Sequence, residues 1–289
     1  MNKYKITTDS TSDLPFSYLK ENDIGLLPMS FQIDGQEFEG DKEFDVKAFY
    51  NKMREGSMPT TAQVTPQVAT EKFKKILDEG YDILHIAFTS GMSGSYNSSS
   101  LAAIELQEEY PDSKIIVIDS LCASLGEGLL VYKAVNLKNQ GYTIEEVRDW
   151  IEDNKLNLCH YVTVDDLNHL YRGGRVSKAT AIVGSIIGVK PIIHVNNEGK
   201  LIPIGKARGR KQSLNTLVNY MKKLTEGYED KNDIIFISHG DCEEDAKYLA
   251  DKIQKELGYD KFLFNYIGPT VGTHSGPNTI ALFFMGKER

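Results

Sequence analysis

The sequence predicts an α/β protein of two domains: a Rossmann-like parallel sheet with flanking helices, followed by an α+β domain with a mixed or antiparallel sheet. Three observations support this fold class. The chain has 289 residues, enough for two domains of ~100 to 200 residues each. Its first half alternates strand and helix patterns, and its second half adds hairpin signals. We place the domains at residues 1–157 and 158–289 and expect a ligand between them.

The first half contains short, apolar, β-branched runs that predict strands at residues 4–7, 83–88 and 114–118. Helical patterns follow these runs at residues 15–20, 95–109 and 123–139. This alternation is typical of a parallel sheet with right-handed crossovers. Between the first two strands we expect an insertion with a hairpin over residues 26–33 that turns at Asp34-Gly35, then helices at residues 45–55 and 66–79.

The second half mixes hairpin and helix signals. After a predicted helix at residues 143–153, we expect a strand at 160–164 and a short helix at 165–171. Strands at residues 191–195 and 201–206 flank Asn196-Asn197-Glu198-Gly199, a hairpin signal. Helices and strands then alternate at residues 212–225, 233–238, 243–257 and 262–266, and a last strand is expected at 279–285. Residues 268–277 are punctuated by glycine and proline and predict a loop.

The charge balance excludes some partners. The chain has 33 Lys and Arg against 41 Asp and Glu, a net charge of -8. Nucleic acids and anionic membranes are bound through clustered cations, so neither is expected as the main partner.

The first residues lack the apolar stretch of a secretory signal, and the longest apolar run, at residues 181–189, is shorter than the ~20 residues that span a bilayer. The three cysteines are far apart, which favours reduced thiols. We therefore expect a cytoplasmic protein with no transmembrane segment.

Hydroxyl-rich loops follow all three predicted strands of the first domain. They comprise residues 7–12, 89–95 and 119–120. In an open parallel sheet such loops meet at the carboxyl edge, where ligands bind. In the middle loop, Gly91 and Gly94 permit a tight turn, and the next helix would direct its N–H groups toward Ser93. This pattern indicates a site for an anion or carboxylate. The alternative, that Ser93 or Ser95 only caps the helix, stays open.

Known catalytic and cofactor motifs do not match. The middle loop has Ser95 where a nucleophile elbow needs its second glycine, and no P-loop or dinucleotide signature occurs. The histidines lack the spacing of zinc ligands. We expect no catalytic residue, no metal and no cofactor.

Two further segments carry polar residues in a site-like setting. In the first, Thr65 and Pro66 are expected to start a helix as N-cap and N1 residues, which leaves Thr61 and Gln63 unexplained. In the second, His274 lies among glycines that permit close approach of backbone to a ligand.

Two cationic segments remain. Arg175 follows two glycines, and we interpret it as a structural arginine between the domains. The run that contains Lys206, Arg208 and Arg210 is unusual in an acidic chain. We predict that it docks an acidic partner, although a merely solvated face would show the same pattern.

In this order, the segments resemble the DegV family, fatty-acid-binding proteins that include the lipid-carrying subunit of bacterial fatty acid kinase. The motifs that carry the resemblance span the chain: Asp9 to Leu14, the Thr-rich segment at Thr61, Ser90 to Ser95, Asp119-Ser120, Leu170 to Arg175, and Ile267 to Pro277. Ala62, Val64 and Asn278 depart from the residues common in the family.

The resemblance implies two α/β domains that enclose one long-chain fatty acid. Its carboxylate would be held by Thr61, Ser93 and His274, with Gly94, Thr273, Ser275 and Gln63 beside them. The chain would present this carboxylate to a separate kinase subunit, which makes an acyl phosphate for phospholipid synthesis, and would not itself be an enzyme. One alternative is an enzyme that uses Ser93 and His274. It would be either an acyl hydrolase or a subunit similar to those of dihydroxyacetone kinases. Another is a regulatory module whose own side chains fill the tunnel.

Overall fold

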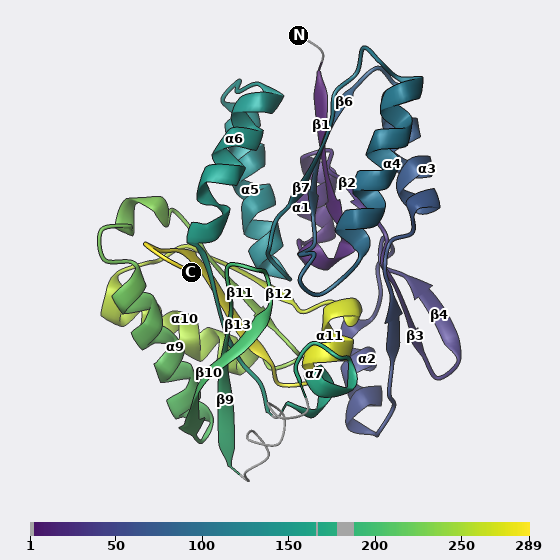
Figure 1. Ribbon diagram of the computed structural model, residues 1–289. Helices are drawn as coiled ribbons and strands as arrows, with labels where there is room; N and C mark the ends of the chain where they lie inside the picture. The colour runs from purple at the N-terminus through teal and green to yellow at the C-terminus, as the bar shows by residue number, and fades with distance from the viewer. Residues whose placement is uncertain (1–2, 166, 178–187) are drawn as a thin grey trace.

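The computed structural model describes residues 3–165, 167–177 and 188–289. Their strands form a four-stranded sheet of order β2-β1-β6-β7, a three-stranded sheet of order β4-β3-β5 and a six-stranded sheet of order β10-β9-β8-β13-β11-β12 (Figure 1). The strands of the first two sheets all come from residues before 158, and those of the third all come after 157. None of the helices in these stretches has the length and apolar character needed to cross a bilayer.

The four-stranded sheet is parallel throughout, as the sequence predicts. Its strands are β1 (Tyr4–Asp9), β2 (Gly25–Leu27), β6 (Asp82–Ala87) and β7 (Ile115–Asp119). The helices of this half are α1 (Phe16–Glu21), α3 (Pro66–Asp78), α4 (Ser95–Glu109), α5 (Leu125–Asn139) and α6 (Ile144–Asn154). In Figure 1, α5 and α6 lie on one side of the sheet and α3 and α4 on the other. Because both faces are covered, every residue of β6 is buried.

The insertion forms the three-stranded sheet, with β3 (Ser30–Ile33), β4 (Gln36–Glu39), β5 (Thr60–Ala62) and the helix α2 (Val46–Arg54). The predicted turn is confirmed: Asp34 and Gly35 both have positive φ, 51° and 79°, as a two-residue hairpin loop requires. The predicted extent of the hairpin was wrong, because Leu26 belongs to β2 of the parallel sheet. The pairing of β5 with β3 was not predicted.

The six-stranded sheet is mixed, as predicted. Its strands are β8 (Leu158–Thr163), β9 (Val189–Val195), β10 (Leu201–Arg208), β11 (Ile235–His239), β12 (Phe262–Tyr266) and β13 (Ile280–Met285). Among the described strand pairs of this sheet, β11 and β12 are parallel and the others are antiparallel. The helices α9 (Arg210–Leu224) and α10 (Glu243–Leu257) share a hydrophobic core with one face of this sheet.

Two short helices differ from the sequence expectation. The predicted helix at residues 165–171 starts later, as α7 (Asn168–Arg172), and its residue 166 lies outside the described residues. The predicted loop at 268–277 was wrong: it contains α11 (Pro269–Ser275). Pro269 occupies N1, where its missing N–H costs nothing, and Gly276 ends the helix with φ 81°. The glycines that suggested a loop serve close packing instead, since a Cβ on Gly272 would lie 2.4 Å from the Tyr50 hydroxyl.

Helix α5 lies between the two large sheets and joins their cores. Its side chains pack on β1 and β6 on one side and on β8, β11 and β13 on the other. Two glycines allow this close fit: a Cβ on Gly126 would lie 2.1 Å from the ring of His160, and one on Gly128 would lie 2.7 Å from the Ser12 carbonyl. Residues 125–131 of the helix are therefore all buried, including the carboxyl-bearing Glu127.

Three carboxyl groups are buried near this junction. Glu127 Oε1 lies 2.6 Å from Thr8 Oγ1 and accepts from the Asp9 N–H, and Oε2 accepts from Thr11 Oγ1. Burial raises the pKa of Asp9 and of Asp13 to about 7. Burial first, and then the Asp9 charge, raises the pKa of Glu127 well above its usual value. The folded protein therefore holds protons here that the unfolded chain releases above about pH 4.

These protons should make stability depend on pH. The free energy of unfolding contributed by these protons is complete below about pH 4 and is lost as the pH rises through about 7. Between these values it falls by up to ~1.4 kcal/mol per pH unit for each proton. We expect Asp9→Asn to flatten this decrease, because an amide has no proton to release. Urea unfolding at pH 5 to 8 measures the two slopes, and equal slopes for wild type and variant would contradict the assignment.

Candidate ligand-binding cavity

A cavity of about 80 Å³ lies between the carboxyl end of the parallel sheet and the second domain. Most of its lining is apolar and comes from both halves of the chain, including Met29, Phe88, Met92, Val162, Ile193 and Phe283. The cavity shares Met92, Arg175 and Leu201 with an open groove of about 1010 Å³. The described lining of the cavity includes no acidic residue.

Polar side chains from three separate segments of the chain line the cavity. Thr61 from β5, Ser93 from the loop before α4, and His274 and Ser275 from α11 all line it. Thr61 Oγ1 and His274 Nε2 are hydrogen-bonded at 2.8 Å, although 213 residues separate them. The structure therefore brings together the residues that the sequence singled out in three separate segments.

Ser93 combines a place in the cavity wall with a bond to the helix start. Its Oγ accepts from the Ser95 N–H at 3.2 Å and lies 3.0 Å from Ser95 Oγ. The N-cap residue itself is Gly94, which has no side chain to cap with. The alternative that a serine here only caps the helix is therefore correct in part. Ser93 satisfies one N–H of the first turn of α4, but it also lines the cavity.

Three predicted ligand residues lie outside the cavity lining. Gln63 Oε1 accepts from the Gly94 N–H at 3.2 Å, so these two residues hold the Thr-rich segment against the serine loop. A Cβ on Gly94 would lie 2.3 Å from Gln63 Oε1, which explains the glycine. Thr273 faces an outer hollow that Thr61 and His274 also line, and its hydroxyl donates to the Pro269 carbonyl.

The imidazole of His274 is neutral at physiological pH. Burial, the Arg175 charge and His169 together lower its pKa to about 4. Its Nδ1 has no hydrogen-bond partner within the described residues and lies against Gly173, where a Cβ would be 2.0 Å away. A neutral ring that is already bonded to Thr61 can donate or accept a hydrogen bond but is a weak base.

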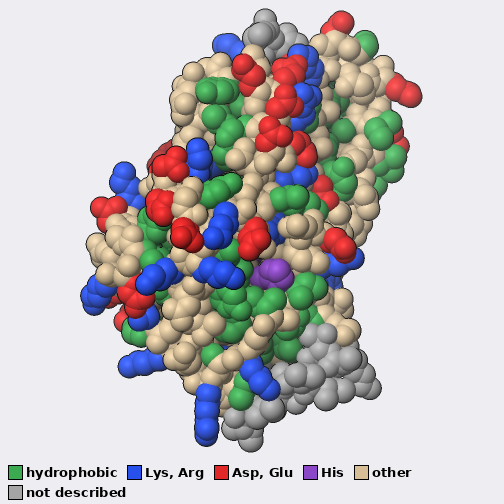
Figure 2. Space-filling model, turned by 60° about the vertical axis from the view of Figure 1, so that its left-hand side comes forward, with side chains coloured by type: hydrophobic (Ala, Val, Ile, Leu, Met, Phe, Trp, Pro, Cys, Tyr) green, Lys and Arg blue, Asp and Glu red, His purple; other side chains and the backbone are tan. Residues whose placement is uncertain are grey.

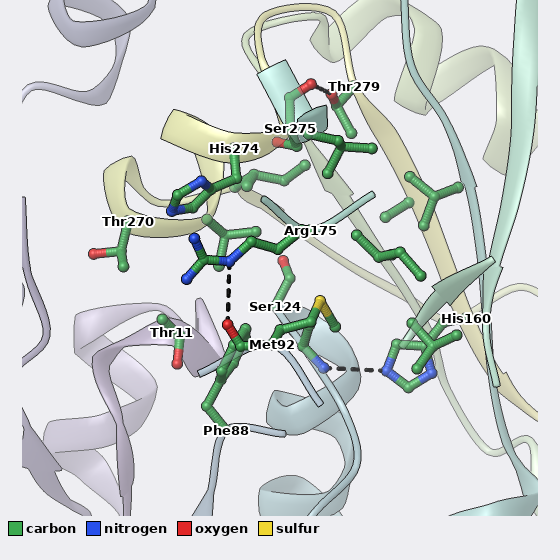
Figure 3. Close-up of a pocket in the computed structure, with 18 of the residues that line it drawn as sticks. Thr11, Phe88, Met92, Ser124, His160, Arg175, Thr270, His274, Ser275 and Thr279 are labelled. Atoms are coloured by element: carbon green, nitrogen blue, oxygen red, sulfur yellow. Dashed lines mark hydrogen bonds between the residues drawn. The ribbon is translucent and has the colours of Figure 1, made fainter. Parts of the chain in front are cut away.

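Arg175 adds the positive charge of the site. Its Nε donates to the Met92 carbonyl at 3.1 Å, across the domain interface, and the side chain also lines the cavity. Figure 3 shows Arg175 and His274 on one side of the pocket and His160 on the other. The sequence interpretation as an interdomain arginine missed its place in the cavity wall, which a Gly-Gly-Arg pattern cannot indicate.

Other residues of the predicted hydroxyl-rich loops hold these loops in place. Asp119 Oδ1 accepts from the N–H groups of Ser90 and Leu121. Thr89 Oγ1 donates to the Gly199 carbonyl at 3.0 Å, so the β9–β10 turn of the second domain rests on the serine loop of the first. Gly91 permits this contact, because a Cβ there would lie 2.5 Å from the Glu198 carbonyl. The sequence analysis did not select Ser124 or His160, and both line the cavity. Ser124 lies at the end of the loop that follows β7, and His160 lies on β8.

The chain belongs to the DegV family. Residues 3–287 match the family described as DegV, an uncharacterised protein family. A DegV domain-containing protein of Clostridium perfringens is 45% identical to this chain, over 100% of this chain and 99% of that protein.

Solved structures share the fold. A DegV family protein from Thermus thermophilus, described by its fatty acid binding, has a TM-score of 0.87 at 26% identity and covers 99% of this chain and 100% of its own. A stearic-acid-binding protein from Eubacterium ventriosum has a TM-score of 0.89 at 26% identity, with 98% of both chains covered. Both of these solved structures are described by the fatty acids that they bind, and this chain shares their α/β fold.

Proposed function

We propose that this chain binds a long-chain fatty acid in the interdomain cavity, with its carboxylate at Thr61, Ser93 and His274. It then presents the carboxylate to a partner kinase, in the cytoplasm, for acyl-phosphate formation in phospholipid metabolism. The observation that carries the proposal is a mostly apolar cavity whose lining includes the hydroxyls of Thr61 and Ser93, the imidazole of His274 and the guanidinium of Arg175, with no acidic residue among its described lining residues. The fatty acids held by the related structures support it.

The energetics fit such a ligand. Burial of a sixteen-carbon chain contributes roughly 11 kcal/mol at ~0.8 kcal/mol per CH₂, before the cost of ordering it. A buried carboxylate without partners would cost several kcal/mol. The Arg175 charge and the hydroxyls of Thr61 and Ser93 offset that cost through charge-assisted hydrogen bonds.

The cavity must widen or extend to admit the whole chain. Its volume of about 80 Å³ is below the ~300 to 1,000 Å³ typical of small-molecule pockets. Met29 and Met92 line it, and methionine side chains rearrange readily. The adjoining groove, which shares Met92 and Leu201 with the cavity, offers further apolar surface.

Two observations favour a carrier over an acyl hydrolase that uses Ser93 and His274. The ring of His274 is bonded to Thr61, and its pKa of about 4 makes it a poor base at neutral pH. Among the described residues, no side chain bonds to its Nδ1 to orient the ring as in a catalytic triad. Incubation with a p-nitrophenyl ester, and separately with ATP and dihydroxyacetone, tests both enzymatic alternatives, and turnover above that of Ser93→Ala would support an enzyme.

The proposed docking surface consists of Lys206 and Arg208 on β10. Both side chains are exposed on the edge strand of the six-stranded sheet. Arg210 differs from them, because its guanidinium is turned inward and donates to Asp245 and to the Asn278 carbonyl. Below the histidine in Figure 2, the visible charged side chains are mostly Lys and Arg. This surface is suited to an acidic partner.

Removal of either hydroxyl should weaken fatty acid binding. Thr61→Ala and Ser93→Ala should each cost ~1 to 3 kcal/mol, because a buried polar partner is stranded. The double variant should be non-additive if both hydroxyls contact one carboxylate. Titration with a fluorescent fatty acid measures this, with Thr216→Ala on α9 as the control. Wild-type affinity in both single variants would refute the site.

The head group should matter for stabilisation. A fatty acid should raise the melting temperature, because it binds the folded chain only. Its methyl ester should do so much less, since it lacks the anion that Arg175 and the start of α4 favour. Thermal unfolding with each ligand measures the difference, and equal shifts would show that the head group is not recognised.

Charge reversal on β10 should affect only the partner. Arg208→Glu should leave lipid affinity and melting temperature nearly unchanged but slow phosphorylation by the kinase in a salt-sensitive way. Lys255→Glu, the same change of charge on α10, should leave phosphorylation at the wild-type rate. Loss of lipid binding by Arg208→Glu without kinase would place Arg208 in the pocket and contradict the docking surface.

A further inference from the structure

Asp13 connects the two domains at the base of the helix that carries His274. It follows the first hydroxyl-rich loop, is only 7% exposed and has a left-handed backbone with φ 52°. Its backbone carbonyl accepts from Asn265 Nδ2 at 2.7 Å. Neither the lipid chain nor the carboxylate site uses this residue in the proposed function.

One carboxylate oxygen of Asp13 holds the start of α11. Oδ1 accepts from the Gly268 N–H at 3.0 Å. Gly268 is the N-cap residue of α11, which has no side-chain cap. A Cβ on Gly268 would lie 2.6 Å from Asp13 Oδ1, so the glycine is needed for this contact. Asp13 thus fixes, from the other domain, where the helix begins.

The second carboxylate oxygen is bonded to the wall of the cavity. Oδ2 accepts from Ser124 Oγ at 2.5 Å, and Ser124 Oγ lies 3.0 Å from Ser238 Oγ on β11. Ser124 lines the cavity and has φ 54° and ψ -144°, a conformation that non-glycine residues rarely adopt. Such strain persists only where surrounding bonds impose it, so these contacts hold Ser124 in place.

We propose that Asp13 is a positioning residue for the carboxylate site: by fixing Gly268 at the start of α11, it places His274 against Thr61. The inference rests on the proposed function, because it concerns how the fatty acid head group is recognised. The helix has seven residues and carries Thr270, His274 and Ser275 into the cavity wall, so a shift at its first turn moves all three.

The bonding pattern identifies a conservative variant. An amide at position 13 keeps the oxygen that accepts from the Gly268 N–H. Its NH₂ can donate to Ser124 Oγ, which then donates to Ser238 Oγ. Asp13→Asn therefore preserves the contacts, whereas Asp13→Gly removes them without strain at a positive φ. Gly268→Ala disturbs the same contact from the other side and leaves the carboxylate in place.

The test measures head-group discrimination in the whole chain. Dissociation constants for hexadecanoic acid and hexadecanol are obtained by displacement of a fluorescent fatty acid, and their ratio is the preference for the acid. Asp13→Gly and Gly268→Ala should reduce this ratio by about tenfold or more, mainly through weaker acid binding. Asp13→Asn should retain it within about twofold.

Other outcomes overturn the inference. If both ligands weaken by the same factor, or the preference survives in Asp13→Gly, then Asp13 only joins the domains. If Asp13→Gly does not fold, as judged by circular dichroism, Gly268→Ala decides, and an unchanged preference in that variant refutes the positioning role. Absence of any acid preference in the wild type would instead refute the proposed function.

Discussion

Burial of α5 between two sheets is the constraint on which the rest of the structure depends. A helix that packs on β1 and β6 on one side and on β8, β11 and β13 on the other needs apolar residues all round. The sequence supplies them with Leu125, Leu129, Leu130 and Val131, all fully buried. As a result the two domains share one core, and polar groups near the first turn of α5 are removed from water. Several of those groups bond to one another, as Glu127 does to Thr11.

The candidate site follows from this junction. The parallel strands end where α5 begins, so their hydroxyl-rich loops face the second domain rather than solvent. The β9–β10 turn closes one side through the Thr89 contact with Gly199, and α11 closes another through His274. The outcome is a mostly apolar space with Thr61, Ser93 and His274 in its wall. The proposed ligand, with a long apolar chain and one anionic head, would match both the apolar and the polar lining.

Local patterns in the sequence were sufficient for most elements. The helix predicted at 95–109 is α4 with the same bounds, and the Asp34-Gly35 turn lies where its residues require positive φ. Long-range features could not be predicted in this way. Leu26 pairs with Thr8 rather than with the hairpin, and glycines that suggested a loop at 268–277 allow α11 to pack on Tyr50. Thr61, Ser93 and His274 were found through a family resemblance, whereas the roles of Ser124 and Arg175 depend on contacts between domains that no local pattern encodes.

The most direct test of the central proposal is denaturing mass spectrometry of lipid extracted from the purified protein. The proposal predicts a long-chain fatty acid at about one molecule per chain, replaced by hexadecanoic acid after incubation with an excess of it. A protein that carries no fatty acid and takes up none on incubation would contradict it.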